Sequence, residues 1–281
     1  MDVNCGTVGG NGGPGGQANG DWMHVNAIDY NADLDQIVFS SRHQGEIYII
    51  DHSTTTEEAA SHSGGNSGMG GDFIYRWGGP GNYERGDNGD NILSDQHGVN
   101  WIPEGHPGAG NLILFNNYHS GNTAAVLEFE TPIQEDGSYE LIGLNPYGPD
   151  SWTWIYDQNI SSNMQGGAFR LPNGNTLITE AEDARIIEVT ESGSIVYDDT
   201  YPGNQSMIPR ANKYSTDFFD SSYTLGDING DGGIDILDVV MCVNMILGTM
   251  DSSPVADINS DGVVNVLDVI LLINSILGLD G

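Results

Sequence analysis

Two short segments near the C-terminus carry oxygen-bearing side chains at regular intervals. DINGDGGIDILD begins at Asp227, DINSDGVVNVLD begins at Asp257, and both place Asp or Asn at positions 1, 3, 5, 9 and 12. Alternate positions of a tight loop direct their oxygen atoms inward, and Ca²⁺ takes about six to eight such hard ligands. Glycine at position 6, Gly232 and Gly262, permits the sharp turn that the loop requires. The spacing therefore predicts two calcium-binding loops.

The expected ligands are the side-chain oxygens at these positions and a backbone carbonyl at position 7. The first loop would use four carboxylates and the second three, which repel one another unless a cation lies between them. The predicted ligands are Asp227, Asn229, Asp231, Gly233, Asp235 and Asp238 for one ion, and Asp257, Asn259, Asp261, Val263, Asn265 and Asp268 for the other.

An amphipathic helix is expected after each loop, because apolar residues recur there at helical spacing. Gly248 and Gly278 follow the two apolar stripes, as is common at the C-termini of helices. The predicted apolar faces are Leu237, Val240, Met241, Ile246 and Leu247 in the first helix, and Leu267, Ile270, Leu271, Ile276 and Leu277 in the second.

This tandem of loops and helices resembles the dockerin type I family, which has Asp rather than Glu at position 12 and lacks the entering helix of an EF-hand. The resemblance implies a small all-α module that binds two Ca²⁺ ions and docks onto a cohesin-type domain on a scaffold or cell surface. Dockerins contact cohesins near loop positions 10 and 11, which here are Ile236 and Leu237, then Val266 and Leu267. Many dockerins have small hydroxylated residues at these positions, whereas this chain has aliphatic ones.

A second group of residues is suited to bind a small oxyanion. His24 opens the segment HVNAID, His97 opens HGVNWI, Asn26 lies two residues after His24, and Arg42 ends IVFSSR. An Arg guanidinium can bind sulfate or phosphate oxygens in a bidentate manner, and a His can act as nucleophile or general acid near neutral pH. Two alternatives stay open: the four residues could bind a metal, or each His could be an ordinary turn residue.

These residues fall within a loose β repeat. Residues 21–200 alternate β-branched and aromatic runs with Gly, Pro, Asn and Asp, which is typical of all-β structure. The segments Tyr30–Ser41, Ile102–Asn117 and Leu171–Glu180 correspond to one another, and each belongs to a unit of about four strands. Repeated four-stranded units are typical of propeller blades, so we predict an all-β partial β-propeller of about three blades. A β-sandwich is the structural alternative.

The chain is expected to divide into four parts. Within the β part, the insertions Ser53–Gly71 and Tyr83–Ser94 are rich in Gly, Ser and Asp and are expected to be loops. The predicted organisation is a Gly-rich tail at 1–20, a propeller portion at 21–215, a linker at 216–225 and the calcium-binding module at 226–281.

The β part also resembles the arylsulfate sulfotransferase family of bacteria. The resemblance lies in the segments DWMHVNAIDYNADLDQIVFSSRHQGEIYIIDHSTT, GGDFIYRWGGP, QHGVNWIP and FRLPNGNTLITE. Members are secreted or periplasmic six-bladed propellers that move a sulfuryl group between phenols without the nucleotide donor PAPS. The resemblance implies that His97 becomes sulfated, and that His24, Asn26 and Arg42 hold the sulfuryl oxygens and the leaving phenolate. Phenolic sulfate esters and phenols are the implied substrates.

Three hypotheses about function follow from these patterns. The first is an aryl-sulfate sulfotransferase domain that a calcium-dependent dockerin anchors to a cohesin scaffold. The second starts from the upstream region of the family, which includes a further active-site His and has no counterpart in the Gly-rich start of this chain. It expects an N-terminally truncated, inactive propeller that serves as a binding or structural module, with only the dockerin functional. The third is a calcium-dependent carbohydrate binder, which would need exposed aromatic side chains on one face.

The composition excludes several classes of partner. Acidic residues outnumber basic ones 40 to 7, which gives a net charge of −33 and repels nucleic acids and anionic membranes. No run of 18 apolar residues occurs, so no membrane span is expected. Cys5 and Cys242 do not define a redox compartment, and a disulfide between them is not expected. No signal peptide is visible at the start of the chain. The family resemblance nevertheless implies a secreted or cell-surface protein.

Overall fold

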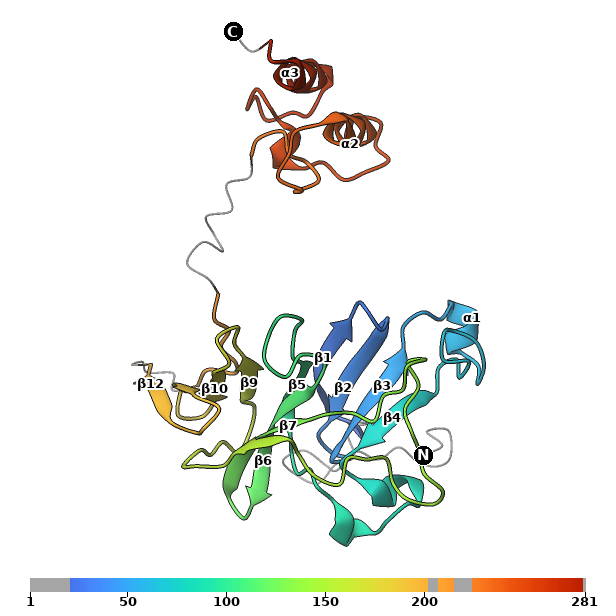
Figure 1. Ribbon diagram of the computed structural model, residues 1–281, viewed down its shortest axis with the longest axis vertical. Helices are drawn as coiled ribbons and strands as arrows, with labels where there is room; N and C mark the ends of the chain where they lie inside the picture. The colour runs from blue at the N-terminus through green and yellow to red at the C-terminus, as the bar shows by residue number, and fades with distance from the viewer. Residues whose placement is uncertain (1–20, 202–206, 215–223, 280–281) are drawn as a thin grey trace. The chain divides into compact units, whose positions relative to one another are not determined.

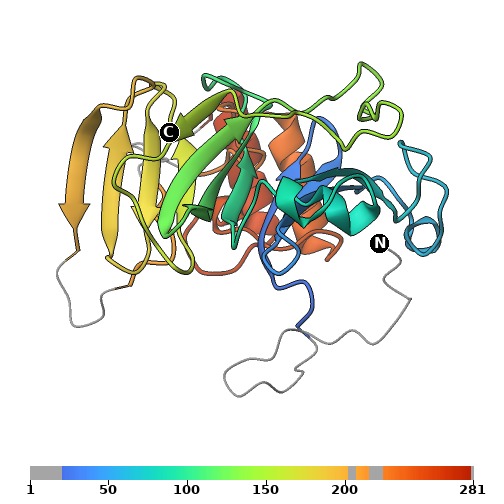
Figure 2. The same ribbon diagram turned by 90° about the horizontal axis from the view of Figure 1, so that it is seen from below.

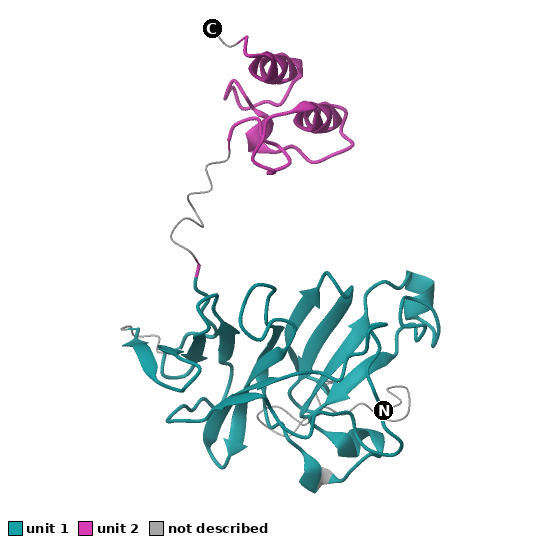
Figure 3. Cartoon of the chain, in the orientation of Figure 1, with its two compact units in different colours: residues 1–213 teal, residues 214–281 magenta. Residues whose placement is uncertain are grey.

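The computed structural model describes residues 21–201, 207–214 and 224–279. They belong to two compact units, residues 1–213 and 214–281, which are considered separately (Figure 3). The predicted tail at 1–20, which includes Cys5, lies outside the described residues, and so does most of the predicted linker at 216–225.

The first unit contains three four-stranded antiparallel sheets (Figure 1). In each sheet, strands that follow one another in the chain are hydrogen-bonded neighbours, so every sheet is a meander. The strands are β1 (Val25–Asn31), β2 (Gln36–Ser41), β3 (Glu46–Asp51) and β4 (Phe73–Trp77); β5 (His97–Trp101), β6 (Leu112–Ser120), β7 (Thr123–Phe129) and β8 (Trp154–Tyr156); and β9 (Gly167–Arg170), β10 (Thr176–Glu180), β11 (Arg185–Val189) and β12 (Ile195–Thr200).

The three sheets follow one another in chain order like the blades of a propeller (Figure 2). The first strands of successive sheets contact one another, β1 against β5 and β5 against β9. The first strand of each sheet is therefore the inner one, as it is in a propeller blade. The predicted fold class, about three four-stranded blades followed by a small helical domain, is confirmed, and the described residues form no closed barrel.

The first four residues of β6, in the middle sheet, form the apolar run LILF. Side chains alternate between the two faces of a strand. On β6, Leu112 and Leu114 pack into a core shared with the first sheet, whereas Ile113 and Phe115 pack into a core shared with the third. All four side chains are fully buried. A strand that is covered on both faces has no polar face, which accounts for the run LILF.

The insertion between β3 and β4 and the one between β4 and β5 contain short helical turns, so the prediction of loops was correct only in part. The first contains α1 (Thr56–Ala59), which starts with a capping box between Thr55 and Glu58. The 3-10 turn η1 (Pro80–Tyr83) begins ahead of the second insertion, and η2 (Asn88–Asp90) lies inside it.

The second unit contains two helices, α2 (Ile236–Ile246) and α3 (Val266–Leu277), and the 3-10 turn η3 (Pro254–Ala256). Asp235 and Asn265 cap the helices, and each side chain accepts a hydrogen bond from a backbone N–H in the first turn. The small core of this unit consists of Val239, Cys242, Ala256 and Leu272, with partly buried apolar neighbours around it.

The apolar faces predicted for these helices are largely not the buried ones. Leu237 and Leu247 of the first stripe are 56% and 69% exposed, and Leu267 and Leu277 of the second are 53% and 63% exposed. The residues that pack inward lie on another face of each helix. The buried Asp238 and Asp268 lie on that face, and their carboxylates accept hydrogen bonds from N–H groups of the loops. In a unit this small, one face of each helix is enough to cover the core. No helix among the described residues is long and apolar enough to cross a membrane.

Candidate active site and calcium-binding loops

The beginnings of the three inner strands converge on one hollow of about 350 Å³. His24 lies directly before β1, His97 is the first residue of β5, and Gln165 lies shortly before β9. The repeat thus places one polar side chain from each sheet at the same site. The hollow is lined by His24, Asn26, His97, Gly98, Gln165, Gly166, Pro209 and Arg210.

Several residues around this hollow have backbone conformations that residues other than glycine rarely adopt. His24, Asp95 and Gln165 have φ values of +51°, +54° and +57°, in the left-handed region. Gly98 also has a positive φ, and a Cβ atom there would lie 3.1 Å from the Cα atom of Gly167. Glycine at position 98 therefore permits the close approach of β5 and the start of β9. Unfavourable backbone conformations that cluster at one place are typical of functional sites.

His97 is held in one defined tautomer. Its Nδ1 lies 2.8 Å from the Asp95 carbonyl oxygen and 2.8 Å from Asn117 Oδ1. Both partners accept hydrogen bonds, so Nδ1 carries the hydrogen. Its Nε2 is then unprotonated and accepts a weak hydrogen bond of 3.2 Å from the Gln165 N–H. The lone pair of Nε2 is therefore the reactive atom of the ring.

Burial keeps this imidazole neutral. His97 is 7% exposed, and burial lowers its pKa below the usual value of about 6.5. Hydrogen bonds from Nδ1 to Asn117 and the Asp95 carbonyl oppose this shift, while the positive charge of Arg42 adds to it. A neutral imidazole at neutral pH is the form that can act as a nucleophile.

Asn117 is a residue that the sequence patterns did not single out. It is 1% exposed, and its Nδ2 donates to the carbonyl oxygens of Ser162 and Gln165, at 2.8 and 2.9 Å. Its Oδ1 is thereby fixed in the position where it accepts from His97. The signal was present in the sequence, since two asparagines interrupt an otherwise apolar strand in LILFNN.

His24 is oriented by a carboxylate. Its Nδ1 lies 2.5 Å from Asp21 Oδ2, and this hydrogen bond holds the pKa of Asp21 below its usual value. The ring also lies 4.9 Å from the ring of His43. Among the described residues, Asp21, His24 and His43 form the one group of three His, Cys, Asp or Glu side chains whose ligand atoms all lie within 4.8 Å of one another. The Asp21 carboxylate is hydrogen-bonded to His24, and the Asp21 carbonyl oxygen is hydrogen-bonded to His43. These hydrogen bonds explain why the three residues lie together without requiring a metal ion.

Asn26 and Arg42 occupy different positions relative to the hollow. Asn26 lines it, with Nδ2 donating to the Gln96 carbonyl oxygen at 2.8 Å and Oδ1 buried without a partner among the described residues. Arg42 does not line the hollow, because its guanidinium forms an ion pair of 2.5 Å with Asp95. The structure therefore brings together His24, Asn26 and His97, and leaves Arg42 beside them.

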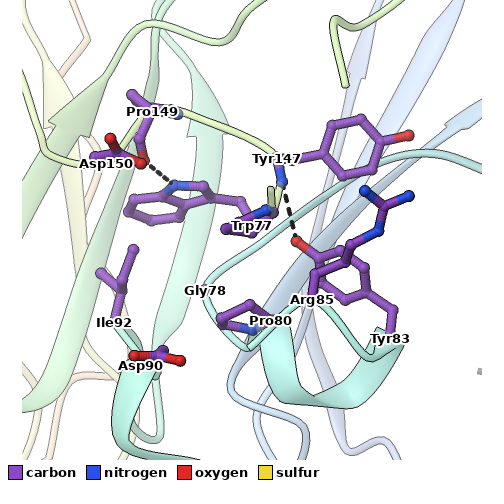
Figure 4. A pocket seen from close by; sticks show the side chains of 11 residues that line it. Trp77, Gly78, Pro80, Tyr83, Arg85, Asp90, Ile92, Tyr147, Pro149 and Asp150 are labelled. Carbon is purple, nitrogen blue, oxygen red and sulfur yellow. Dashed lines mark hydrogen bonds between the residues drawn. The ribbon is translucent and has the colours of Figure 1, made fainter. Parts of the chain in front are cut away.

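A second hollow, of about 370 Å³, lies at the end of β4 (Figure 4). Trp77 Nε1 donates to the Pro149 carbonyl oxygen, and the Tyr83 hydroxyl accepts from the Tyr147 N–H. Trp77 is 1% exposed, so its ring offers no platform for a sugar. Arg85 at the rim donates to backbone carbonyls. This hollow brings together no imidazole and no activated nucleophile.

In the second unit, the loops before α2 and α3 make the sharp turns that were predicted for them. Gly232 and Gly262 have φ values of +88° and +89°, as the predicted turn requires. The carboxylates of Asp227 and Asp257 each accept two backbone N–H groups of their own loop. The loop donors are hard oxygens alone, which fit Ca²⁺ rather than a softer metal.

The last acidic position of each loop is buried. Asp238 and Asp268 are 0% exposed, and each carboxylate accepts three backbone N–H groups at 2.7–3.3 Å. Asp235 and Asn265, at position 9, accept from the Leu237 and Leu267 N–H groups and so cap the helices. Position 9 of such loops often reaches the ion through a water molecule, which is compatible with this second role.

The fold and these two sites define a propeller-like β domain followed by a module with paired acidic loops. A family model of arylsulfotransferase (ASST) matches residues 7–129, and one of the dockerin type I domain matches residues 225–277. The chain therefore contains an arylsulfotransferase-like domain and then a dockerin domain, in the order that the sequence motifs predicted. Dockerin type I domains bind calcium, imply a cohesin partner and are typically extracellular.

Among solved structures, similar ones include a protein of unknown function from Bacteroides caccae, with 10% identity over 64% of this chain and 47% of that chain and a TM-score of 0.37. Virginiamycin B lyase from Staphylococcus aureus has 14% identity over 66% and 44% of the two chains, with a TM-score of 0.35. The β-propeller domain of Myceliophteria thermophila Cps50 (Swd1) has 12% identity over 65% and 43%, with a TM-score of 0.37. This chain spans less than half of each of these structures. No curated protein matches it.

Proposed function

We propose that the first unit transfers a sulfuryl group between phenols through a sulfated His97. We further propose that the second unit binds two calcium ions and docks onto a cohesin domain, in a secreted or cell-surface setting. The observation that carries the enzymatic part is the tautomer of His97. Two acceptors hold the hydrogen on Nδ1, and the lone pair of Nε2 remains for attack.

In the first half-reaction, His97 Nε2 attacks the sulfur of an aryl sulfate. The N–S bond forms, the bond between sulfur and the aryl oxygen breaks, and its electron pair leaves on the phenolate. The substrate displaces the weak contact between Nε2 and the Gln165 N–H. Asp21 accepts a hydrogen bond from Nδ1 of His24, so an imidazolium His24 gives the proton on its Nε2 to the phenolate and becomes neutral. Arg42, beside the hollow, is paired with Asp95, and its guanidinium acts on His97 from there.

In the second half-reaction, the oxygen of an acceptor phenol attacks the sulfur. The S–N bond breaks and its electron pair returns to Nε2 of His97, while the phenol proton passes to the neutral Nε2 of His24. The sulfated ring keeps its hydrogen on Nδ1 and is cationic, and Asn117 Oδ1 and the Asp95 carbonyl stabilise that charge. Asn26 Oδ1 is an unpaired acceptor that suits the hydroxyl of the phenol.

The deciding experiment is sulfuryl transfer from 4-nitrophenyl sulfate to phenol by the calcium-loaded chain. We expect release of 4-nitrophenol and formation of phenyl sulfate in the wild type, and loss of both in His97→Ala. Equal, background release from the two proteins would refute the enzymatic proposal. A binding or structural role of the propeller portion would then remain.

Asn117→Asp should shift the pH dependence of transfer. A carboxylate beside Nδ1 stabilises the imidazolium and raises the pKa of His97, so less neutral nucleophile is present at low pH. The acid limb of kcat/KM should move upward by about one pH unit or more. In the wild type, burial lowers the pKa of His97, so activity should persist below pH 6.5.

The matched control is Asn116→Asp, which places the same charge on the next residue of β6. Asn116 is also buried, but it contacts Ser94 and Ile92 rather than His97. An equal shift of the acid limb in both variants would contradict a specific role for Asn117.

The exposed apolar residues of α2 and α3 support the docking part of the proposal. Leu237 and Leu267, at loop position 11, are both more than half exposed. Leu237→Asp together with Leu267→Asp should weaken binding to an aliphatic-faced cohesin by at least about a hundredfold, because both apolar anchors become charged. Either repeat could serve alone, so each single variant should lose much less. Calorimetric titration against a panel of cohesins tests this; binding that is unchanged in the double variant would locate the docking face elsewhere.

A further inference from the structure

Arg210 differs from the other basic side chains of this acidic protein. The chain has seven Lys and Arg residues, and all of them lie in the described ranges. Five form ion pairs with carboxylates, namely Arg42, Arg76, Arg170, Arg185 and Lys213. Arg85 donates to the carbonyl oxygens of Gly143 and Asn145. Within the described parts of the chain, Arg210 alone has no carboxylate and no carbonyl partner for its guanidinium.

This free cation lines the same hollow as His24 and His97. The segment that carries it is held in place by backbone contacts on both sides of Arg210. The Gly166 N–H donates to the Pro209 carbonyl at 3.2 Å, and the Ala211 N–H donates to Thr179 Oγ1 at 3.1 Å. These two hydrogen bonds attach the segment Pro209–Ala211 to the third sheet and to the residue just before it.

The side chain of Arg210 also packs in a defined place. Its guanidinium carbon lies 5.7 Å from the centre of the Phe169 ring. A Cβ atom on Gly167 would lie 3.3 Å from Cγ of Arg210, so the glycine leaves room for the side chain to cross the mouth. A positive group that is positioned by packing and lacks an internal counter-ion is suited to an anionic ligand.

We propose that Arg210 binds the sulfuryl oxygens of the incoming aryl sulfate and so recruits a monoanionic ester to the hollow. This inference rests on the proposed sulfuryl transfer, and it assigns the initial binding of the anion to Arg210 rather than to Arg42. The charge of Arg42 is already matched by Asp95. A sulfate ester carries one negative charge, which one guanidinium balances. A phosphate monoester carries about −1.5 to −2 at neutral pH and would leave charge unmatched in a chain with a net charge of −33.

Binding can be measured apart from turnover in a chain that carries His97→Ala. Calorimetric titration of this calcium-loaded protein with 4-nitrophenyl sulfate gives the reference affinity. Adding Arg210→Ala should weaken binding about tenfold to a hundredfold, as expected for lost charge-assisted hydrogen bonds. Arg210→Lys should recover only part of the loss, because an ammonium cannot bind two oxygens in the same plane. The reference protein should bind 4-nitrophenyl phosphate more weakly than the sulfate.

Arg85→Ala is the matched control, because it removes the same charge from a rim arginine of the other hollow. It should change the affinity for 4-nitrophenyl sulfate less than about twofold, since distant exposed charges are screened. Equal weakening by Arg85→Ala and Arg210→Ala, or unchanged binding in Arg210→Ala, would overturn the inference.

Turnover separates this inference from the proposed function. Arg210→Ala in the otherwise unaltered chain should raise KM for the sulfate donor far more than it lowers kcat. If binding depends on Arg210 but the unaltered chain transfers no sulfuryl group, the anion site stands and the enzymatic proposal fails. If transfer occurs with the same KM in Arg210→Ala, the enzymatic proposal stands and the role of Arg210 is refuted.

Discussion

Removal of calcium should unfold the second unit and leave the first one folded. The four carboxylates of the first loop and three of the second then repel one another without a counter-ion. The core that opposes this repulsion is small, with Val239, Cys242, Ala256 and Leu272 as its buried residues. A domain of this size has little stability to spare. We expect a chelator to abolish the helical circular dichroism of α2 and α3, and calcium to restore it.

Asp238→Ala should reproduce the effect of chelation in one repeat. Its buried carboxylate accepts from the backbone N–H groups of Ile228, Asn229 and Asp235, and all three would lose their partner. A fully buried group left unpaired costs about 1–3 kcal/mol, and these three N–H groups are only partly buried, so the total loss is on the order of 1–3 kcal/mol before any loss of calcium binding. Asp251→Asn, an exposed position outside the loops, is the control and should change the melting temperature of the unit little.

Calorimetric titration of the calcium-free chain with calcium gives the number of ions that the second unit binds. Two binding events in the wild type and one in Asp238→Ala would agree with one ion per loop. A melting temperature that does not change between calcium and chelator would contradict the calcium proposal for both loops.

His97→Ala should lower sulfuryl transfer by at least about a thousandfold, because the variant lacks the atom that forms the covalent intermediate. His97 is largely buried, so truncation leaves the hollow larger and removes one hydrogen-bond partner from Asn117 Oδ1 and from the Asp95 carbonyl, while the main-chain hydrogen bonds between the strands do not involve this side chain. Added imidazole should restore part of the activity, since it can occupy the vacated space. A variant that had simply lost its fold would show no such rescue.

The intermediate itself provides a second readout. Incubation of the wild type with 4-nitrophenyl sulfate in the absence of a phenol acceptor should add one sulfuryl group per chain, located by mass spectrometry on the peptide that contains His97. The label should disappear when phenol is added. His62→Ala is the control, because that side chain is 89% exposed and forms an ion pair with Asp72, away from the hollow of His97. Labelling that persists in His97→Ala would place the nucleophile elsewhere.

The sequence determined the local features of this protein. Loop spacing and glycine placement depend only on neighbouring residues, so the turns of the two acidic loops, the helices after them and most strands could be predicted from it. The repeat likewise placed His24 and His97 at the starts of the inner strands, because equivalent positions in equivalent blades meet at one centre. β8 was not marked, since it is only three residues long and follows a long insertion. The buried faces of α2 and α3 were misjudged because apolar spacing shows that a stripe exists but not what covers it.

Only the tertiary structure determined which side chains act together. Asn117 fixes the tautomer of His97 from 20 residues away, and Arg210 reaches the hollow from beyond the last strand of the third sheet. The ion pair of Arg42 with Asp95 joins residues 53 positions apart and leaves Arg210 as the free cation. Hydrogen bonds and ion pairs act over a few ångströms, and the packing of the sheets sets those distances between residues that the sequence keeps far apart.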